Sequence, residues 1–305
     1  MENLTNVMKE FAQEHGADLV GVAPIERFSE VPPEHNPAAI FPEAKSVLML
    51  GRRVLRGALR GMEEGTNLHD CSSYGYTWLE NEFIPLLVYR VTQFLEDRGW
   101  EAVPVYPYPV DAAPEGIPVA PDKPAPNVTV DFNLAAVAAG LGEIGYANVF
   151  LSPQYGPRQR FGMIITDAEL EADPLFDGTV CGRCGQCVNE CPLGAMSGET
   201  TVGIAGRSFT VAEVDYSMCG RCKNGAQPNI FHAEGRADRL GAVCMRSCVH
   251  QLEENGKISS AFRQPFRKRA PWKRDSLGKV AVLGEPLPQV GCFDAGQPVT
   301  GGEKR

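Results

Sequence analysis

The sequence lacks long hydrophobic runs, a targeting leader and clustered histidines. Its 305 residues contain no uninterrupted apolar window of about 18 residues, so we expect no membrane-spanning helix. The first ten residues hold neither a basic segment followed by an apolar run nor a twin-arginine pair, which predicts a protein that stays in the cytoplasm. The five histidines do not recur at metalloprotease spacing, so they indicate no separate catalytic metal.

Positive charge is also scarce in this chain. It has 29 lysines and arginines against 38 aspartates and glutamates, which gives a formal net charge of -9. A protein of this charge repels nucleic acid overall, although a local basic patch can still bind it. We therefore do not expect tRNA or DNA as a partner.

Cysteine, in contrast, is abundant. Ten cysteines in a protein of a reducing compartment are rarely used for disulfides, which makes metal ligation the better interpretation. Four of them form the run Cys181-Gly-Arg-Cys184-Gly-Gln-Cys187-Val-Asn-Glu-Cys191, which Pro192 follows. This spacing is typical of bacterial ferredoxins, in which three thiolates hold one 4Fe–4S cluster and the fourth reaches a second cluster.

Four later cysteines complete the number of ligands that two 4Fe–4S clusters need. The ferredoxin pattern predicts that the first cluster is held by Cys181, Cys184, Cys187 and Cys248. It predicts that the second is held by Cys191, Cys219, Cys222 and Cys244. Zinc is the alternative, because short paired spacings also suit tetrahedral sites, but a four-cysteine run ending in proline favours iron and sulfur. Cys71 and Cys292 match no motif, and we expect them to be buried or incidental thiols.

Hydrophobic patterning predicts helices and strands in alternation over the first half of the chain. We expect helices over 4–15, 78–98 and 134–142, and strands over 17–23, 46–51, 103–106 and 161–166. In the second helix, Phe83, Leu87, Val91, Phe94 and Leu95 are predicted to line one buried face. From Cys181 onward we expect little regular structure, because cysteine and glycine dominate there. The predicted units are a compact α/β or α+β domain over 1–175, a cysteine-rich domain over 176–255, and a tail over 256–305.

Two further segments stand out by composition. Eight prolines lie between Pro104 and Pro126, which excludes a helix or an interior strand and predicts a long, stiff, functional loop. A basic stretch from Arg263 to Arg274 holds six cations around Phe266 and Trp272. It is expected either to dock an acidic electron donor or to be a solvated tail.

The segment before the cysteine run resembles a known superfamily. Ala139-Gly-Leu-Gly-Glu-Ile-Gly145, Leu151-Ser-Pro-Gln-Tyr-Gly-Pro-Arg158 and Ile165-Thr-Asp167 precede the ferredoxin motif, and Gly16-Ala-Asp-Leu-Val-Gly-Val22 opens the chain. Together they resemble the epoxyqueuosine reductases and reductive dehalogenases. The resemblance implies an α+β protein with a nitroreductase-like α/β domain that binds a corrinoid (cobalamin), followed by a small ferredoxin-like domain with two 4Fe–4S clusters.

The resemblance also suggests residues for the site. Six tyrosines in or near the first domain could donate a proton beside cobalt, although tyrosines at turns often only pack; of these we take Tyr155 as a candidate. Asp111 and Asp131 lie near the position of an acidic proton donor in the reductases. The candidate corrinoid-binding residues are Gly140, Gly142, Glu143, Gly145 and Arg158. The glycines are included because a backbone without side chains can approach a bulky ring closely.

The function expected from these features is that of an oxygen-sensitive oxidoreductase resembling reductive dehalogenases. It would reduce a small molecule with electrons from a low-potential donor such as ferredoxin or flavodoxin. A non-catalytic electron-transfer or corrinoid-handling protein of ferredoxin type is the alternative. An epoxyqueuosine-type tRNA reductase is disfavoured by the acidic charge and by the absence of a helical-repeat extension after the cysteines.

Overall fold

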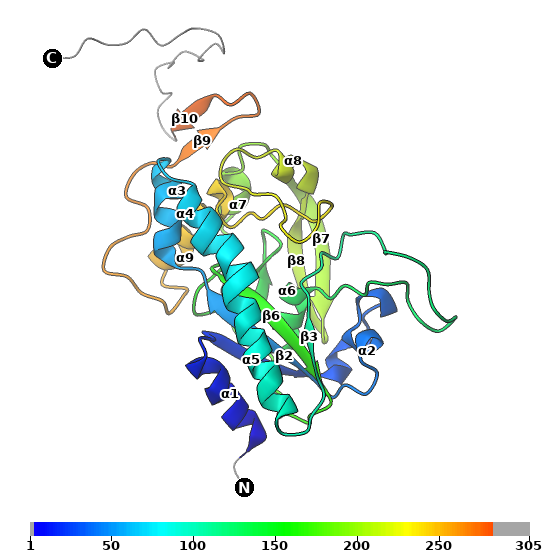
Figure 1. Ribbon diagram of the computed structural model, residues 1–305. Helices are drawn as coiled ribbons and strands as arrows, with labels where there is room; N and C mark the ends of the chain where they lie inside the picture. Colours follow the sequence, from blue (N-terminus) through cyan, green and yellow to red (C-terminus); the bar gives the residue numbers. More distant parts are fainter. Residues whose placement is uncertain (1–2, 283–305) are drawn as a thin grey trace, which may run out of the picture.

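A four-stranded antiparallel sheet organises the first half of the chain (Figure 1). The computed structural model describes residues 3–282. The strands run in the order β1 (Leu19–Pro24), β2 (Ser46–Arg53), β6 (Gln159–Thr166) and β3 (Ala102–Val105). The central pair aligns Ser46 with Thr166 and Arg53 with Gln159, and most of its residues are buried. Pro104 lies in β3 at the edge of the sheet, where a missing N–H disrupts no ladder.

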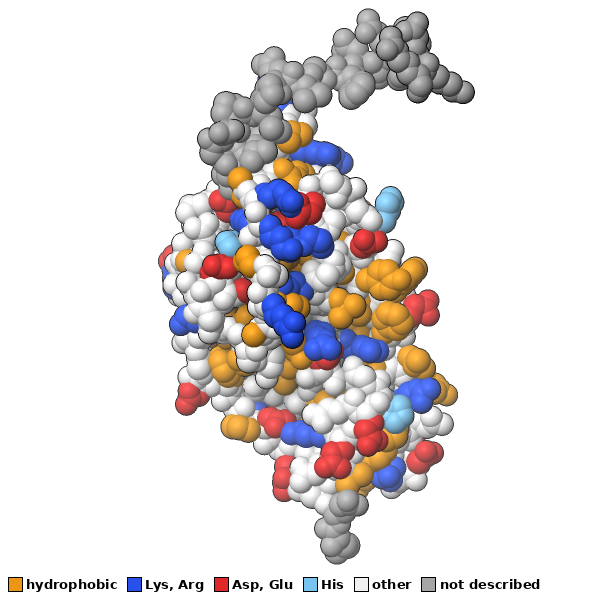
Figure 2. Space-filling view, turned by 90° about the vertical axis from the view of Figure 1, so that its left-hand side faces the viewer, with side chains coloured by type: hydrophobic (Ala, Val, Ile, Leu, Met, Phe, Trp, Pro, Cys, Tyr) orange, Lys and Arg blue, Asp and Glu red, His pale blue; other side chains and the backbone are white. Residues whose placement is uncertain are grey.

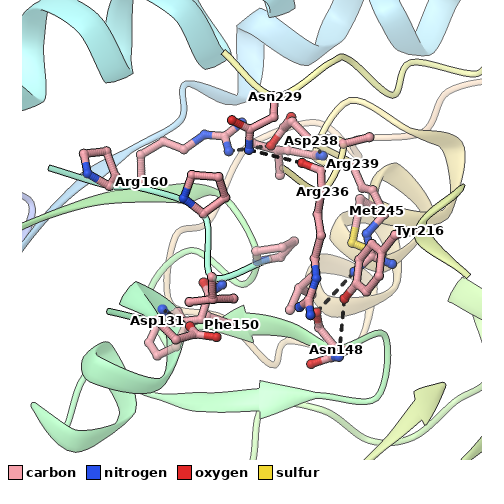
Figure 3. A pocket seen from close by; sticks show the side chains of 18 of the residues that line it. Asp131, Asn148, Phe150, Arg160, Tyr216, Asn229, Arg236, Asp238, Arg239 and Met245 are labelled. Carbon is pink, nitrogen blue, oxygen red and sulfur yellow. Dashed lines mark hydrogen bonds and ion pairs between the residues drawn. The ribbon is translucent and has the colours of Figure 1, made fainter. Parts of the chain in front are cut away.

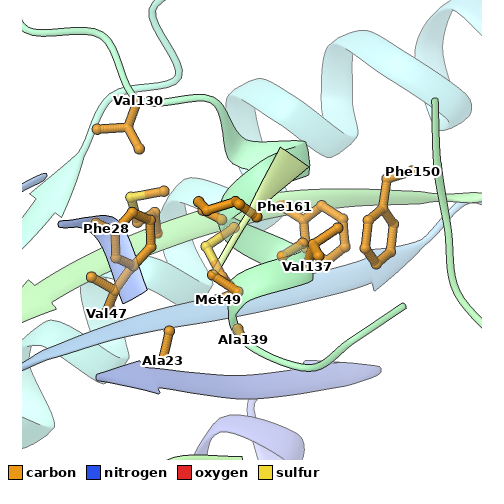
Figure 4. Close-up of a cluster of buried hydrophobic side chains, with 14 of the residues drawn as sticks. Ala23, Phe28, Val47, Met49, Val130, Val137, Ala139, Phe150 and Phe161 are labelled. Carbon is orange, nitrogen blue, oxygen red and sulfur yellow. The ribbon is translucent and has the colours of Figure 1, made fainter. Parts of the chain in front are cut away.

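Helices cover both faces of this sheet. Because successive side chains of a strand point to opposite faces, Leu48 and Leu50 of β2 pack in a cluster with α1 (Leu4–Glu14) and α5 (Ile84–Glu96). Val47 and Met49 point the other way and pack with α6 (Phe132–Ala138). Figure 4 shows this second cluster, in which the sheet residues meet Val137 and Ala139. The first half is therefore a mixed α/β structure in three layers.

Shorter elements complete this half. They are 3₁₀ turns at Ile25–Phe28, Pro33–His35 and Arg56–Leu59, short helices α2 (Pro37–Ile40), α3 (Arg60–Glu64) and α4 (His69–Ser72), and strands β4 (Glu143–Gly145) and β5 (Val149–Leu151). Two π-helical turns, Ser73–Thr77 and Leu79–Phe83, connect α4 to α5. The expected elements of residues 4–166 are thus confirmed in type. The expectation that Phe83 lies on the buried face of the second helix is wrong. Phe83 is 39% exposed, and the Arg52 guanidinium lies over its ring at 5.5 Å from the ring centre.

The second half is more regular than its composition predicts. The elements are α7 (Gln186–Asn189), β7 (Met196–Ile204), β8 (Arg207–Val214), α8 (Tyr216–Gly220), α9 (Val243–Glu254), β9 (Trp272–Arg274) and β10 (Val280–Val282). The expectation of little regular structure after Cys181 is therefore wrong. It overlooked Ala205-Gly206, whose φ angles of 53° and 71° form a two-residue turn of the kind that joins twisted hairpin strands.

The hairpin β7–β8 packs back onto the first half. Ile204 and Val211 are buried in the same cluster as Val47 and Met49 of the sheet. Leu252 and Ile258 likewise pack on Leu151 and Val180. Apolar packing thus crosses the predicted domain limit near residue 175, which itself stays a prediction.

Residues 257–274, which we call the C-terminal strap, are anchored to the first half at several points, while most of them are exposed. Phe266 is wholly buried beside Leu59 and Met62 of the 56–64 segment. Arg267 pairs with Glu63 at 2.6 Å, and the Trp272 indole N–H donates to the Met62 carbonyl at 2.9 Å. Figure 2, seen from the left of Figure 1, shows Lys and Arg side chains gathered along this face. The docking of an acidic donor by the strap stays a prediction.

Two further expectations concern the cysteines outside the motifs and the membrane. Cys71 is buried, as expected, and burial raises its pKa to about 11. Cys292 lies outside the described residues. Within residues 3–282, every helix is too short or too polar to cross a lipid bilayer.

Candidate metal centres and adjoining cleft

The four cysteines predicted for the first cluster line one small hollow. Cys181 and Cys184 come from the loop that leads into α7, Cys187 lies in α7, and Cys248 comes from α9. The loop is fixed by Glu143, whose carboxylate accepts hydrogen bonds from the Val180 and Cys181 amides at 2.8 and 2.6 Å. A further amide, that of Tyr146, donates to the Cys181 sulfur at 3.3 Å. Cys184 is exposed, so this hollow lies at the surface.

The other four cysteines line a second, separate hollow. Cys191 follows α7, Cys219 lies in α8, Cys222 follows α8, and Cys244 lies in α9. Cys219 and Cys244 are each 6% exposed. The Ala195 amide donates to the Cys191 sulfur at 3.3 Å, as amides commonly do to cluster ligands. The structure thus brings together the two sets that the spacing predicts, while the metal they hold remains a prediction.

Zinc and a 4Fe–4S cube make different demands on four cysteines. A zinc ion needs all its sulfur ligands about 2.3 Å away, whereas a cube binds one cysteine at each of four separated iron corners. The choice of a cube at these hollows rests on the cysteine spacing and stays a prediction.

Burial makes free thiolates costly at these positions. It raises the pKa of Cys187 to about 11 and that of Cys244 to about 12, and the neighbouring cysteines of each set add to the shift. The pKa of Cys248 is raised well above its ordinary value for the same reasons. Metal ligands must be deprotonated, so iron binding would replace these protons and offset the cost.

The largest cleft lies next to the second hollow and has a volume of about 570 Å³. Pro107 to Val110 of the proline-rich loop, the start of α6 and residues 229–240 line it. Two adjoining hollows of about 240 and 430 Å³ share Val110, Asp131 and Arg236 with it. Sites for small molecules and cofactors commonly measure roughly 300–1,000 Å³.

Arg160 is the centre of a charge cluster in the wall of the cleft. Its Nη1 contacts the Asp238 carboxylate at 2.5 Å (Figure 3). Its Nε lies 3.7 Å from Glu80, and its guanidinium stacks on Tyr76 at 4.7 Å. Burial raises the pKa of Glu80 to about 7, because the charge of Arg160 only partly offsets the loss of water. The Glu80 carboxyl at the edge of the cleft therefore keeps its proton to a higher pH than an exposed glutamate does.

A second polar group faces this cluster across the cleft. Arg236 pairs with Asp111 at 2.6 Å and stacks on the Tyr216 ring at 4.3 Å. Arg239 donates to the carbonyls of Ala147 and Asn148 at 3.0 and 3.1 Å. Arg239 also lines the second cysteine hollow, so it borders both spaces.

The structure brings two of the three proposed proton donors to the cleft. Asp131 lines it and also caps α6, where its carboxylate accepts from the Asn133 and Leu134 amides at 2.8 and 3.1 Å. Asp111 lines its outer part beside Arg236. Tyr155 instead lies in the turn that Ser152 and Gly156 close, and it does not line the cleft.

The proposed corrinoid-binding residues have partners inside the protein. A Cβ added at Gly140, Gly142 or Gly145 would lie 2.2 Å from the Pro174 carbonyl, 2.1 Å from the Leu151 carbonyl or 2.5 Å from the Leu151 side chain. Close packing of the chain on itself therefore explains these glycines.

The other two proposed residues have structural partners as well. Glu143 fixes the first cysteine loop, and the buried Arg158 donates to the Val54 carbonyl. None of the five lines the largest cleft, so direct contact with a corrinoid has no support at these positions.

Sequence reasoning missed most of the polar residues of the cleft. They are Glu80, Tyr216, Asn229, Arg236, Asp238 and Arg239. The one available signal was the charged group Arg236-Ala-Asp-Arg239 within a segment otherwise rich in glycine and cysteine.

The raised pKa of Glu80 predicts a pH-dependent effect of Glu80→Gln. The unfolded chain releases this proton near pH 4.5 and the folded chain near pH 7, so ionisation destabilises the wild type increasingly across that window. Glutamine cannot ionise, so the stability of the variant relative to wild type should rise between pH 4 and 8, by up to roughly 3 kcal/mol. Anaerobic thermal melts at both pH values test this. The exposed Glu82→Gln is the matched control, and equal effects of Glu80→Gln at both pH values would contradict the assignment.

Comparisons with known proteins find relatives of two kinds. No family model matches the chain. The epoxyqueuosine reductase of Listeria monocytogenes is 40% identical over 65 residues, which are 21% of this chain and 17% of that protein. A tetrachloroethene reductive dehalogenase of Desulfitobacterium hafniense is 40% identical over 67 residues, 21% of this chain and 12% of that protein. The epoxyqueuosine reductase of Gloeobacter violaceus is 28% identical over 153 residues, 49% of this chain and 45% of that protein.

A solved structure extends the likeness to the fold. A catabolic reductive dehalogenase superposes with a TM-score of 0.53 at 19% identity, covering 79% of this chain and 31% of the other. The chain matches less than half of the length of each curated relative named above. The matches to both kinds of reductase confirm the resemblance stated from the sequence. Over parts of its length the chain is therefore similar in sequence to both the epoxyqueuosine reductases and the reductive dehalogenases.

Proposed function

We propose that this protein is an iron–sulfur reductase that uses a corrinoid to reduce a small molecule, with electrons passing through two 4Fe–4S clusters. The observation that carries the proposal is that the second cysteine hollow adjoins the largest cleft, with Arg239 in the wall of both. A redox centre beside a cleft of this size is the arrangement that an enzyme reducing a bound molecule needs. In this proposal residues 1–175 form a nitroreductase-like domain, 176–255 a ferredoxin-like domain and 256–305 a tail.

The positions of the two cysteine hollows suggest the direction of electron flow. The first hollow opens to the surface at Cys184, and the exposed Lys257 lies on its rim. A cation beside an exposed redox site favours an acidic donor, which fits a low-potential ferredoxin or flavodoxin. The second hollow is more deeply buried and lies toward the cleft. Electrons would therefore enter at the first site and leave from the second.

The size and the lining of the cleft and its two adjoining hollows support the binding of both a corrinoid and a small substrate. Three adjoining hollows that share Val110, Asp131 and Arg236 offer more room than one drug-sized ligand needs. Prolines and apolar side chains alternate there with arginines and carboxylates, which fits a large ring fringed by amides. When bound, a corrinoid supplies a cobalt centre that exchanges electrons with the substrate. The chain itself would exclude water and hold a proton on Glu80 near neutral pH.

The first prediction concerns the clusters. Anaerobically prepared protein should contain about eight iron atoms and eight acid-labile sulfides per chain, the content of two 4Fe–4S cubes. Metal analysis and sulfide assay measure both. Stoichiometric zinc with little sulfide would refute the cluster proposal.

A second prediction concerns the division of the ligands. Cys187→Ser and Cys191→Ser should each damage a different cluster, because the two side chains line different hollows. Paramagnetic resonance of the two reduced variants should show different residual signals. Identical residual signals would mean that the two sets of four are assigned wrongly.

A third prediction concerns the corrinoid. Val110 lines all three parts of the cleft, so Val110→Trp should fill the space and lower cobalamin affinity at least tenfold. Val119→Trp is the matched control, because Val119 belongs to the same loop and is 88% exposed. Both variants should keep the wild-type iron content and melting temperature. If wild-type protein binds no cobalamin at micromolar concentration under anaerobic conditions, the corrinoid proposal fails and the electron-transfer alternative takes its place.

A further inference from the structure

Arg239 is a buried cation without a carboxylate partner. The side chains of the other cleft arginines are paired: Arg160 contacts Asp238, and Arg236 contacts Asp111. Arg239 is only 6% exposed, yet it makes no ion pair with any residue of the described range 3–282. A buried charge is expensive unless an opposite charge accompanies it. We therefore expect an anion to lie next to Arg239.

The hydrogen bonding of Arg239 leaves one side free for that anion. Its Nη2 donates to the carbonyls of Ala147 and Asn148, which hold the guanidinium in place. Tyr216 lies against the guanidinium at 5.2 Å from the ring centre. Its Nη1 is buried and has no partner among the described residues. A buried, unpaired N–H group of this kind marks a place where a group absent from the protein chain is expected.

The second cysteine set adjoins Arg239. Arg239 lines the same hollow as Cys219 and Cys244. A 4Fe–4S cluster held by four thiolates is an anion, and each one-electron reduction adds one further negative charge. A fixed cation beside it stabilises the reduced form more than the oxidised form.

We propose that Arg239 is the buried counter-charge of the second cluster and raises its reduction potential above that of the first. The inference rests on the proposed function, since it requires that the clusters are present. The electron comes from the low-potential donor, passes to the first cluster and then to the second, and no bond is made or broken. Arg239 thereby makes the cluster beside the cleft the thermodynamic acceptor. In this proposal Arg239 acts through its charge on the second cluster and does not contact the substrate.

The test is a redox titration of full-length, anaerobically purified Arg239→Gln followed by paramagnetic resonance. The signals are assigned with Cys187→Ser and Cys219→Ser, which remove ligands of different hollows. We expect the second cluster to become at least tenfold harder to reduce, a shift of about 59 mV to lower potential for one electron. The first cluster should keep its potential. Arg239→Lys, which retains the charge, should stay closer to wild type.

Arg236→Gln is the matched control. Arg236 lies in the same cleft and stacks on the same Tyr216, but Asp111 already neutralises it. Its loss should leave both potentials unchanged. A lower melting temperature with two unchanged potentials in Arg239→Gln would show a purely structural role and overturn the proposal.

Other outcomes are equally decisive. If Arg239→Gln loses the second cluster while Arg239→Lys keeps it, the charge requirement holds. Loss of the cluster in both variants would assign the effect to the hydrogen bonds of the guanidinium and refute the charge argument. Wild-type protein without iron and sulfide would refute the proposed function together with this inference. Two intact clusters with an unchanged titration in Arg239→Gln would refute the inference alone.

Discussion

The packing of α7 against α9 determines how the cysteine-rich half is built. Each helix serves both hollows: Cys187 and Cys191 lie in and just after α7, and Cys244 and Cys248 lie one turn apart on α9. Residues four apart share a helix face, so the two cysteines of α9 point to the same side at different heights. Two hollows therefore lie side by side along one helix pair. The chain crosses between them, which is the arrangement that the predicted exchange of the fourth ligand requires.

Buried ion pairs join this helix pair to the rest of the molecule. Arg246 of α9 is wholly buried and pairs with Glu63 of α3, which also pairs with Arg267 of the C-terminal strap at 2.6 Å. On the opposite side, Arg160 of β6 pairs with Asp238. Such pairs cost desolvation and add little net stability, but removal of one partner is strongly destabilising. Their effect is to fix one relative placement of sheet and cysteine loops, and the cleft lies at that junction.

Local patterns in the sequence predicted local features of the structure well. The short apolar run at 46–51 predicted strand β2, the helical spacing over 4–15 predicted α1, and the cysteine spacing predicted the two sets of four. Residues that depend on distant partners were missed. Glu80 and Asp238 acquire their character from Arg160, which is 80 and 78 residues away in sequence, and no local pattern encodes such a meeting. The conspicuous glycine turn at 140–145 drew attention to a cofactor, whereas its glycines are required by packing on Leu151 and Pro174.

The character of the cleft bears on the choice between an enzyme and an electron carrier. An electron carrier needs only an exposed cluster, which the first hollow alone would provide at Cys184. It has no use for a cleft of about 570 Å³ beside a second, buried site. Nor does it need a carboxyl whose pKa is raised to about 7, where a proton can be given up at neutral pH. Reduction of a bound molecule requires electrons and protons at one place, and in the proposed function the second cysteine set and Glu80 would supply them around the same cleft.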